Sequence, residues 1–462
     1  MTSRTAVRGW HRFMVALVMV ALTTSQVSVA LAGNWGGAVG GVVINIEGNV
    51  ENATAAQRAA LAKLRREEIK QPGDEMNRSV ELRKISLKAL EAACEKALRE
   101  DSGKLPDDIK YLGGLLRVQY VFVYPEQNDI IIAGPAEGWK IDDAGNVVGA
   151  TTGRPVVQLD DLVVALRTVQ AAREGGIRCS INPTAEGNKR LADLLAQQRQ
   201  QLKAALGQSP NIPVLEQEMK KAFGPQVVSL TGVPDTSHFA RVLVAADYRM
   251  KRLAMNLDPA PIAGFPSYIE MFKSGAKDPQ VNPRWWLACN YEPVAKTDDN
   301  LSWELRGQGV KCLTEDDAFQ ADGTVKQTGK ASPVAQKWAD MMTDRYEELS
   351  AQEPIFGELR NVMDLCVVAA LIDQHDLFGR AGSSFSLLTG TTTDVLVPQR
   401  WNAPKSIAPQ CSFLRSGKSW VVAASGGIQI ESFRVATNVE TSSTIQQVRD
   451  QAGQGGENWW WN

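Results

Sequence analysis

The residues of this chain that could do chemistry at neutral pH are few, and most of them are carboxylates. The sequence holds three histidines, and only His238 and His375 lie beyond the first 32 residues. Two histidines so far apart do not form the ligand cluster of a zinc site, and they leave few candidates for a general base. We therefore expect no metal site, no cofactor and no histidine-based catalytic centre.

Two short motifs resemble known signatures but lack the rest of them. Gly417-Lys418-Ser419 resembles the end of a phosphate-binding loop, which needs a glycine where this chain has Ser412 and a helix where it has strand-like residues. Ser274-Gly-Ala-Lys277 matches the S-x-x-K of penicillin-recognising enzymes but has neither partner motif. We therefore expect a hairpin turn and a loop here, with no mononucleotide site and no nucleophilic serine.

The stretch Asp235-Thr-Ser237-His238 places a carboxylate, a hydroxyl and an imidazole side by side. Catalytic triads, however, are assembled in space and not from adjacent positions. Asp235 or Ser237 instead fits the N-cap of a helix, with His238 in its first turn. We interpret this stretch as the start of a helix.

A turn-rich stretch, Gly134-Pro-Ala-Glu-Gly-Trp139, provides the candidate binding residues. Trp139 has a large ring with a hydrogen-bond donor, suited to stacking on a ligand or anchoring a partner. Glu137 is close in sequence, and Asp160 and Asp161 begin a helix that could approach this stretch. The alternative is that Trp139 covers the core of a hairpin, so that the loop is purely structural.

The hydrophobic patterns predict the helices and strands that must position these residues. Asp160 and Asp161 begin a helix over 161–173, where the helix dipole favours acids in the first turn. Further helices are expected at 52–71, 86–100, 184–206, 237–257, 333–351 and 355–372. Strands are expected at 42–46, 116–124, 129–133, 138–141, 147–148, 177–181 and 226–230, with an antiparallel meander over 285–291, 301–305 and 310–313 and a hairpin over 410–414 and 420–424.

The six cysteines are too sparse for a disulfide scaffold and form no C-x-x-C motif. Cys366 lies in an apolar helical run, so we expect a buried free thiol. Cys289 and Cys312 flank the expected meander and could meet across it as a disulfide, although spacing alone does not decide connectivity.

The first 32 residues have the three parts of a secretory signal. Arg4, Arg8 and Arg12 precede an apolar run over 13–22, and Ala30-Leu-Ala32 is a small-residue cleavage site. We therefore expect export to the periplasm or the extracellular space, with a mature chain that begins at Gly33. No later segment is long and apolar enough to predict a membrane span.

Composition predicts a folded chain, with 44% hydrophobic residues and a formal net charge of −2. This charge is too small for the basic footprint of a nucleic-acid partner. We expect an α+β fold in two mixed helix and antiparallel-sheet units, 42–207 and 214–437. A flexible Gly-rich lead (33–41) would precede them, and a polar tail (438–462) would follow. The tail ends in Trp459-Trp460-Trp461, whose rings need a docking place on this chain or on a partner.

Several stretches together resemble a family of exported planctomycete proteins that is carried as a domain of unknown function. These stretches are Val118 to Ile130, Ala133-Gly-Pro-Ala-Glu-Gly-Trp-Lys140, Gly153-Arg-Pro155, Leu159-Asp-Asp-Leu162 and Cys179-Ser-Ile-Asn-Pro-Thr184. The resemblance is strongest over 118–187 and extends more weakly to 239–255 and 284–317. It implies an exported bacterial protein and no particular activity.

From these observations we expect a non-enzymatic exported protein that binds an unknown protein or ligand outside the cytoplasm, or that serves in the cell envelope. The alternative is an exported hydrolase that uses paired carboxylates, for example on glycans.

Overall fold

The computed structural model describes residues 38–100, 104–204, 211–273, 282–319, 324–390, 395–410, 412–416, 419–423, 425–452 and 460–462. The expected signal peptide and the residues Ser274, Lys277, Lys418 and Trp459 lie outside these ranges.

In the described part of the chain, the larger of the two main sheets has nine strands of mixed direction. Most neighbours are antiparallel, but β10 pairs with β18 and β15 with β2 in parallel. In spatial order the strands are β1 (Val42–Ile44), β2 (Asn49–Asn52), β15 (Ser406–Ile407), β9 (Gln226–Thr231), β8 (Ile177–Pro183), β18 (Ser425–Ile430), β10 (Asn282–Asn290), β13 (Gly309–Phe319) and β14 (Val325–Gln327).

The second main sheet has six strands, and β3 forms one of its edges. In spatial order these are β19 (Val439–Thr441), β11 (Val294–Lys296), β12 (Ser302–Glu304), β4 (Tyr120–Tyr124), β5 (Asp129–Ala136) and β3 (Val80–Ser86). Two separate hairpins are β6 (Trp139–Ile141) with β7 (Val147–Gly149), and β16 (Ser412–Ser416) with β17 (Ser419–Ala423).

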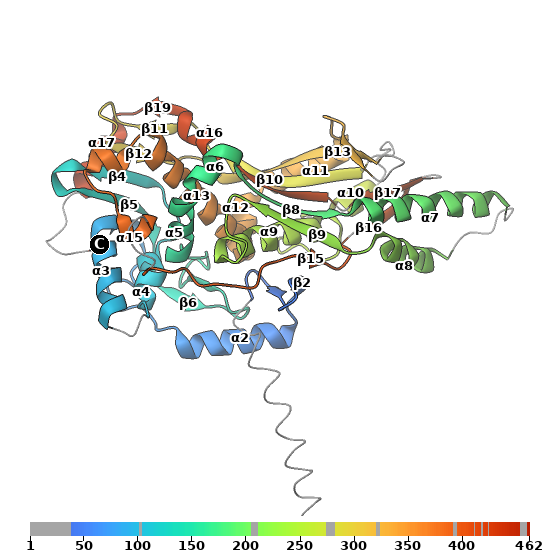
Figure 1. Ribbon diagram of the computed structural model, residues 1–462, viewed down its shortest axis with the longest axis horizontal. Helices are drawn as coiled ribbons and strands as arrows, with labels where there is room; N and C mark the ends of the chain where they lie inside the picture. Colours follow the sequence, from blue (N-terminus) through green and yellow to red (C-terminus); the bar gives the residue numbers. More distant parts are fainter. Residues whose placement is uncertain are drawn as a thin grey trace, which may run out of the picture.

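Helices connect these strands and cover both sheets. They include α2 (Ala55–Glu68), α3 (Leu87–Glu100), α4 (Asp107–Lys110), α5 (Leu159–Arg167), α6 (Val169–Gly175), α7 (Ala185–Ala204), α8 (Ile212–Phe223), α9 (His238–Ala254), α10 (Tyr268–Lys273), α11 (Pro333–Asp344), α12 (Tyr346–Gln352), α13 (Pro354–Gln374), α14 (Leu377–Ala381), α15 (Ser386–Thr389), α16 (Ser432–Thr437) and α17 (Thr444–Ala452). The helical hairpin of α7 and α8 projects beyond one end of the molecule, and the six-stranded sheet lies at the other end (Figure 1). None of the described helices is long and apolar enough to cross a membrane.

The α+β class predicted from sequence is confirmed. The two expected units, however, share both main sheets. The nine-stranded sheet combines β1, β2 and β8 with strands that follow residue 214, and β4 of the other sheet pairs with β12. Described parts of the expected lead and of the expected tail also belong to the fold. Val39 exchanges two backbone hydrogen bonds with Val42, and Ile445 in the expected polar tail is 1% exposed.

Several local expectations differ from the structure. The expected meander is not one sheet, because β12 pairs with β4 and β11 and not with β10 or β13. The helix expected over 161–173 is two helices that meet at Thr168, and the one expected over 333–351 is two helices that meet at Arg345. Cys289 and Cys312 are free thiols: in the β10–β13 ladder Cys289 faces Val310 and Cys312 faces Leu287, so the two are diagonal neighbours and not a direct pair.

Helix α13 forms the centre of the core. All of its residues from Ile355 to Ile372 are buried, and the polar ones among them are Glu358, Arg360, Asn361 and Asp364. Cys366 lies in this helix at 3% exposure as a free thiol, as predicted, and burial raises its pKa well above the ordinary value.

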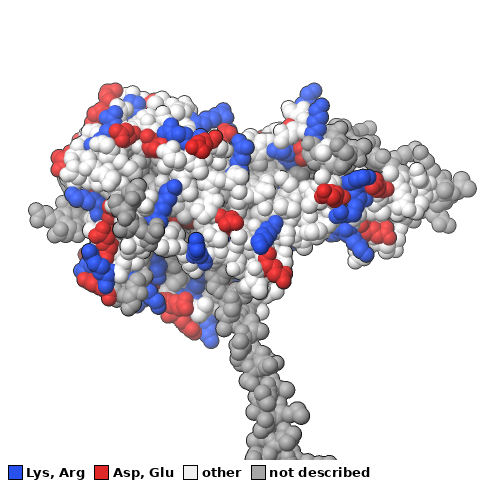
Figure 2. Space-filling model, viewed as in Figure 1, with Lys and Arg blue, Asp and Glu red and all other residues white. Residues whose placement is uncertain are grey.

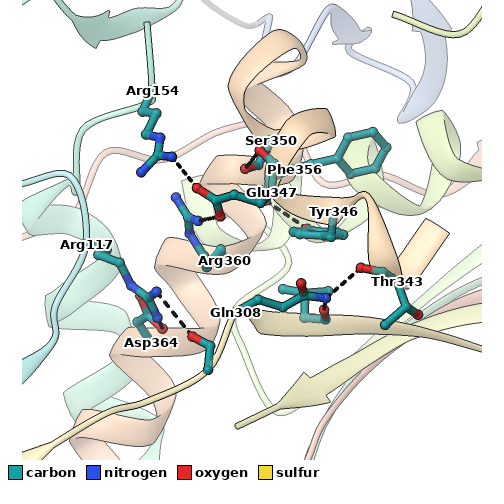
Figure 3. A network of polar contacts seen from close by, with 12 residues as sticks. Arg117, Arg154, Gln308, Thr343, Tyr346, Glu347, Ser350, Phe356, Arg360 and Asp364 are labelled. Carbon is teal, nitrogen blue, oxygen red and sulfur yellow. Dashed lines mark hydrogen bonds and ion pairs between the residues drawn. The ribbon is translucent and has the colours of Figure 1, made fainter. Parts of the chain in front are cut away.

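Ion pairs attach two N-terminal segments to this central helix (Figure 3). Arg117 forms two hydrogen bonds with the carboxylate of Asp364, each 3.0 Å long, and Asp364 is fully buried. Glu347 on α12 pairs with both Arg154 and Arg360. These contacts hold the segment after β7 and the segment before β4 against α12 and α13.

Candidate functional site

A cleft of about 1420 Å³ lies between α2, α4 and the start of α5. One wall comes from residues 68–76, another from residues 104–111, and a third from residues 395–399. Of the four candidate residues named from the sequence, Trp139 and Asp160 line this cleft, whereas Glu137 and Asp161 are not part of its lining.

Trp139 forms part of the cleft wall but is itself a core residue. Its side chain is 2% exposed, its ring lies 5.5 Å from that of Tyr111, and its Nε1–H donates to the Lys70 carbonyl at 3.1 Å. Burial raises the pKa of Tyr111 to about 12, so its hydroxyl stays neutral. The two rings therefore give the cleft a rigid aromatic base.

Asp160 presents a carboxylate to the cleft from the first turn of α5. Its Oδ2 accepts a hydrogen bond from the Gln399 backbone N–H at 3.0 Å, which links α5 to the wall formed by residues 395–399. Burial raises the pKa of this carboxyl group, and the nearby Asp161 raises it further.

Glu137 has a structural position behind the cleft. The side chain is fully buried, and its carboxylate accepts the backbone N–H groups of Thr151 and Thr152 together with the Thr152 hydroxyl. It therefore braces the turn that follows β7. The loop expected at 134–139 is also shorter than predicted, because Gly134, Pro135 and Ala136 still belong to β5.

Asp161 pairs with His238, a contact that reasoning from the sequence missed. Ser237 caps α9 as predicted, with its hydroxyl accepting the Ala240 N–H at 3.0 Å, and this places His238 in the first turn. His238 Nδ1 lies 3.0 Å from both carboxylate oxygens of Asp161. Its Nε2 lies 3.3 Å from the side-chain amide nitrogen of Gln158, which lines the cleft. The imidazole thus lies one side chain behind the cleft surface.

A second buried acid belongs to this cluster. Glu358 on α13 is 8% exposed, and its Oε2 has no hydrogen-bond partner among the described residues. Burial raises its pKa to about 7, while the charge of His238 opposes that rise. No signal in the sequence marks Glu358, because it stands in a long helix whose other residues are mostly apolar.

Two of the four candidate binding residues thus have structural partners, because Thr152 bonds the carboxylate of Glu137 and His238 bonds that of Asp161. No group of three or more histidine, cysteine or carboxylate side chains in the described part of the chain could hold a metal ion.

Comparison with known families finds a match for one segment of the chain. Residues 179–268 match a family described as "Protein of unknown function (DUF1598)". This segment carries a DUF1598 domain. Its elements are β8, α7, α8, β9 and α9. In the sequence, the projecting helical hairpin therefore connects β8 to β9, which are neighbouring strands of the nine-stranded sheet. No curated protein and no solved structure matches the chain.

The match and the resemblance seen in the sequence both indicate a domain of unknown function. It overlaps the strongest stretch of that resemblance, 118–187, only at 179–187, and it contains the weaker stretch 239–255. His238 belongs to the DUF1598 domain, whereas Glu137, Trp139, Asp160 and Asp161 precede it.

Proposed function

We propose that this protein is a non-enzymatic binding protein, exported from a bacterial cell, whose cleft takes a basic segment of a polypeptide partner. The observation that carries the proposal is the make-up of the cleft, which combines a large excess of acids with apolar side chains. Its expected position outside the cytoplasm rests on the signal-like first 32 residues.

The charges of the cleft favour a cationic ligand. Its lining includes six carboxylates, at Glu68, Asp74, Glu75, Asp107, Asp108 and Asp160, against three lysines, at Lys70, Lys104 and Lys110. Lys110 is paired with Asp107 at 3.1 Å, which leaves most of the acids available to a ligand. On the face of the molecule that Figure 2 shows, Lys and Arg side chains are interspersed with Asp and Glu side chains. The excess of acids over lysines in the cleft lining would attract a cationic ligand to this place.

Apolar side chains of the cleft add a second requirement. Val395 is 56% exposed and Val397 is 62% exposed, and both line the cleft near the rings of Tyr111 and Trp139. Large apolar side chains gathered at a concave surface are typical of binding sites. A polypeptide that carries arginine or lysine beside leucine-like residues meets both requirements, whereas a free sugar or a phosphate meets neither.

The test uses a fluorescent peptide of alternating arginine and leucine, with a glutamate and leucine peptide for comparison. We expect the intact protein to bind the basic peptide more weakly as salt is added, because exposed charges are screened. The triple variant Glu68→Gln, Asp74→Asn, Glu75→Gln should lose at least about tenfold in affinity, as removal of electrostatic complementarity predicts.

A matched control removes three exposed acids that lie outside the cleft lining, Glu126→Gln, Asp193→Asn and Glu218→Gln, and it should bind like the parent. Equal losses in the two triple variants would show that net charge alone attracts the peptide, and the proposal would fall. Export is tested separately by the intact mass of protein recovered outside the cytoplasm, which we expect to begin at Gly33.

A further inference from the structure

Residues 460–462 lie along the outer edge of β3. The Lys84 N–H donates to the Asn462 carbonyl at 2.9 Å, and the Asn462 N–H donates to the Lys84 carbonyl at 3.0 Å. The Ser86 N–H donates to the Trp460 carbonyl at 2.9 Å. The other edge of β3 pairs with β5, so these three bonds use the only edge of this strand that the sheet leaves open. An open edge strand is a template for another strand.

The aromatic rings of this segment occupy a surface beside the strand. Trp461 lies next to the guanidinium of Arg83, whose central carbon is 5.3 Å from the ring centroid. Gly113, at φ 61°, lies beneath the same residue, and a Cβ at this position would be 3.5 Å from the Cβ of Trp461. Trp460 and Trp461 are both half-buried, with their rings at 72° to one another.

The surface that receives these residues is held in place by other contacts. Arg83 is 1% exposed, and its guanidinium donates to the carbonyls of Met76, Arg78 and Gly113. None of these bonds involves residues 460–462. Ile85, directly opposite Trp461, is fully buried and pairs with Ile132 of β5 on its other side. The edge and the surface beside it are therefore formed by residues far from 460–462 in the sequence.

We propose that the outer edge of β3, together with the surface of Arg83 and Gly113, is a binding site for an extended, aromatic-rich peptide strand. Residues 460–462 are its occupant within the chain, and the same segment supplied as a separate molecule binds there when the internal one is missing. Such strand addition takes its affinity from backbone bonds and its specificity from side-chain pockets. The contact is small, so its occupancy within one chain depends on tethering, which raises the local concentration of a segment to the millimolar range.

This site is distinct from the proposed ligand cleft in the bonds that it uses. Trp461 lines both, but the strand site needs the backbone of β3, whereas the cleft needs carboxylates on α2 and in residues 74–75. Failure of one proposal therefore leaves the other to be decided by its own measurement.

The experiment uses a labelled peptide with the sequence of residues 456–462, Gly-Glu-Asn-Trp-Trp-Trp-Asn, and a chain that ends at Ala452. We expect saturable binding to the shortened chain and at least about tenfold weaker binding to the full chain, where the internal segment competes. The peptide Gly-Glu-Asn-Ala-Ala-Ala-Asn should bind neither. Amide exchange at Lys84 and Ser86 should be slow in the full chain, fast in the shortened chain, and slow again when the tryptophan peptide is added.

A full-length Trp460→Ala, Trp461→Ala variant provides a second test in case the shortened chain does not fold. It keeps all of the backbone, and it should bind the tryptophan peptide better than the parent does. Equal binding by parent and variant, or a shortened chain that folds but neither binds the peptide nor recovers protection at Lys84, would overturn the proposal.

Discussion

His238 Nδ1 lies 3.0 Å from both carboxylate oxygens of Asp161, and both side chains are buried, at 6% and 5% exposure. Burial alone would lower the pKa of His238, but the charge and hydrogen bonds of Asp161 outweigh it, so this pKa is raised above 6.5. The imidazole therefore carries its proton further into the neutral range than a free histidine does. The pair joins α5, which presents Asp160 to the cleft, to α9 of the DUF1598 domain.

Substitution Asp161→Asn should destabilise the protein most under acidic conditions. Because the folded-state pKa of His238 is raised, its pairing contributes fully below pH 6.5 and is lost as the pH rises through the folded value. Removing one partner of a buried pair costs about 3 kcal/mol. Urea unfolding should therefore show a larger loss at pH 6 than at pH 9. Asp160→Asn, one residue away, is the control and should show a smaller difference between the two pH values.

Substitution Glu358→Gln should stabilise the protein at alkaline pH. Burial raises the folded-state pKa of this carboxyl from 4.5 to about 7, so stability falls as the pH rises from 4.5 through 7 and the group is forced to ionise. An amide mimics the protonated acid and does not ionise. We expect nearly equal unfolding free energies for variant and parent at pH 4, and a gain of roughly 3 kcal/mol for the variant at pH 8. A loss at pH 8 would show that ionised Glu358 serves as a second anion for His238.

Local signals allowed much of the secondary structure to be predicted. Ser237 and Ser332 cap α9 and α11, and Pro354 begins α13, because capping side chains and proline act within a few residues of a helix start. On β10, Trp285 is fully buried while Trp286 is half-buried and lies against Arg284, because successive side chains of a strand point to opposite faces.

The features that position the candidate site depend on contacts between distant residues. Asp161 and His238 are 77 positions apart, and no periodic pattern relates them. Residues of β12 have the same strand-like pattern whichever sheet they join, so the sequence could not show that β12 pairs with β4. Contact between distant residues also decides where Trp461 binds. The sequence indicated that this ring needs a binding place, but it could not identify β3 as that place.

Substitution Trp139→Ala distinguishes a structural role of this residue from a ligand-binding one. The ring is 2% exposed and its Nε1–H is bonded to Lys70, so truncation should cost about 3–5 kcal/mol, as for other buried aromatics. Trp139→Phe keeps most of the packing and should lose about 1 kcal/mol with the hydrogen bond. Thermal unfolding measures both. A melting temperature for Trp139→Ala within a few degrees of the parent would contradict the structural role and restore Trp139 as a ligand-contacting residue.

Lys251 and Asp247 form a buried ion pair, and the lysine also donates a hydrogen bond to a backbone carbonyl of β8. They lie one turn apart on α9 at 1% and 0% exposure, with Lys251 Nζ 2.9 Å from Asp247 Oδ2. The same ammonium donates to the Ile181 carbonyl at 2.8 Å. Strand β18 pairs with β8 only as far as Gly427 opposite Ser180, so Ile181 lies just beyond that ladder. The lysine thus satisfies a backbone carbonyl that the neighbouring strand does not reach.

Single and double substitutions of this pair should therefore lower the free energy of unfolding by different amounts. Burial raises the pKa of Asp247 and lowers that of Lys251, which means that both charges are held at a desolvation cost. Lys251→Met leaves a buried carboxylate without its cation, and we expect a loss of about 3–5 kcal/mol. The double variant Lys251→Met, Asp247→Leu removes both charges and leaves the backbone groups of Ile181 without their side-chain partners, at a cost of about 1–3 kcal/mol. The double variant should thus be more stable than Lys251→Met in urea unfolding at pH 7. If the losses of the two single variants simply add in the double variant, the pair is not coupled, and the carbonyl alone explains the presence of Lys251.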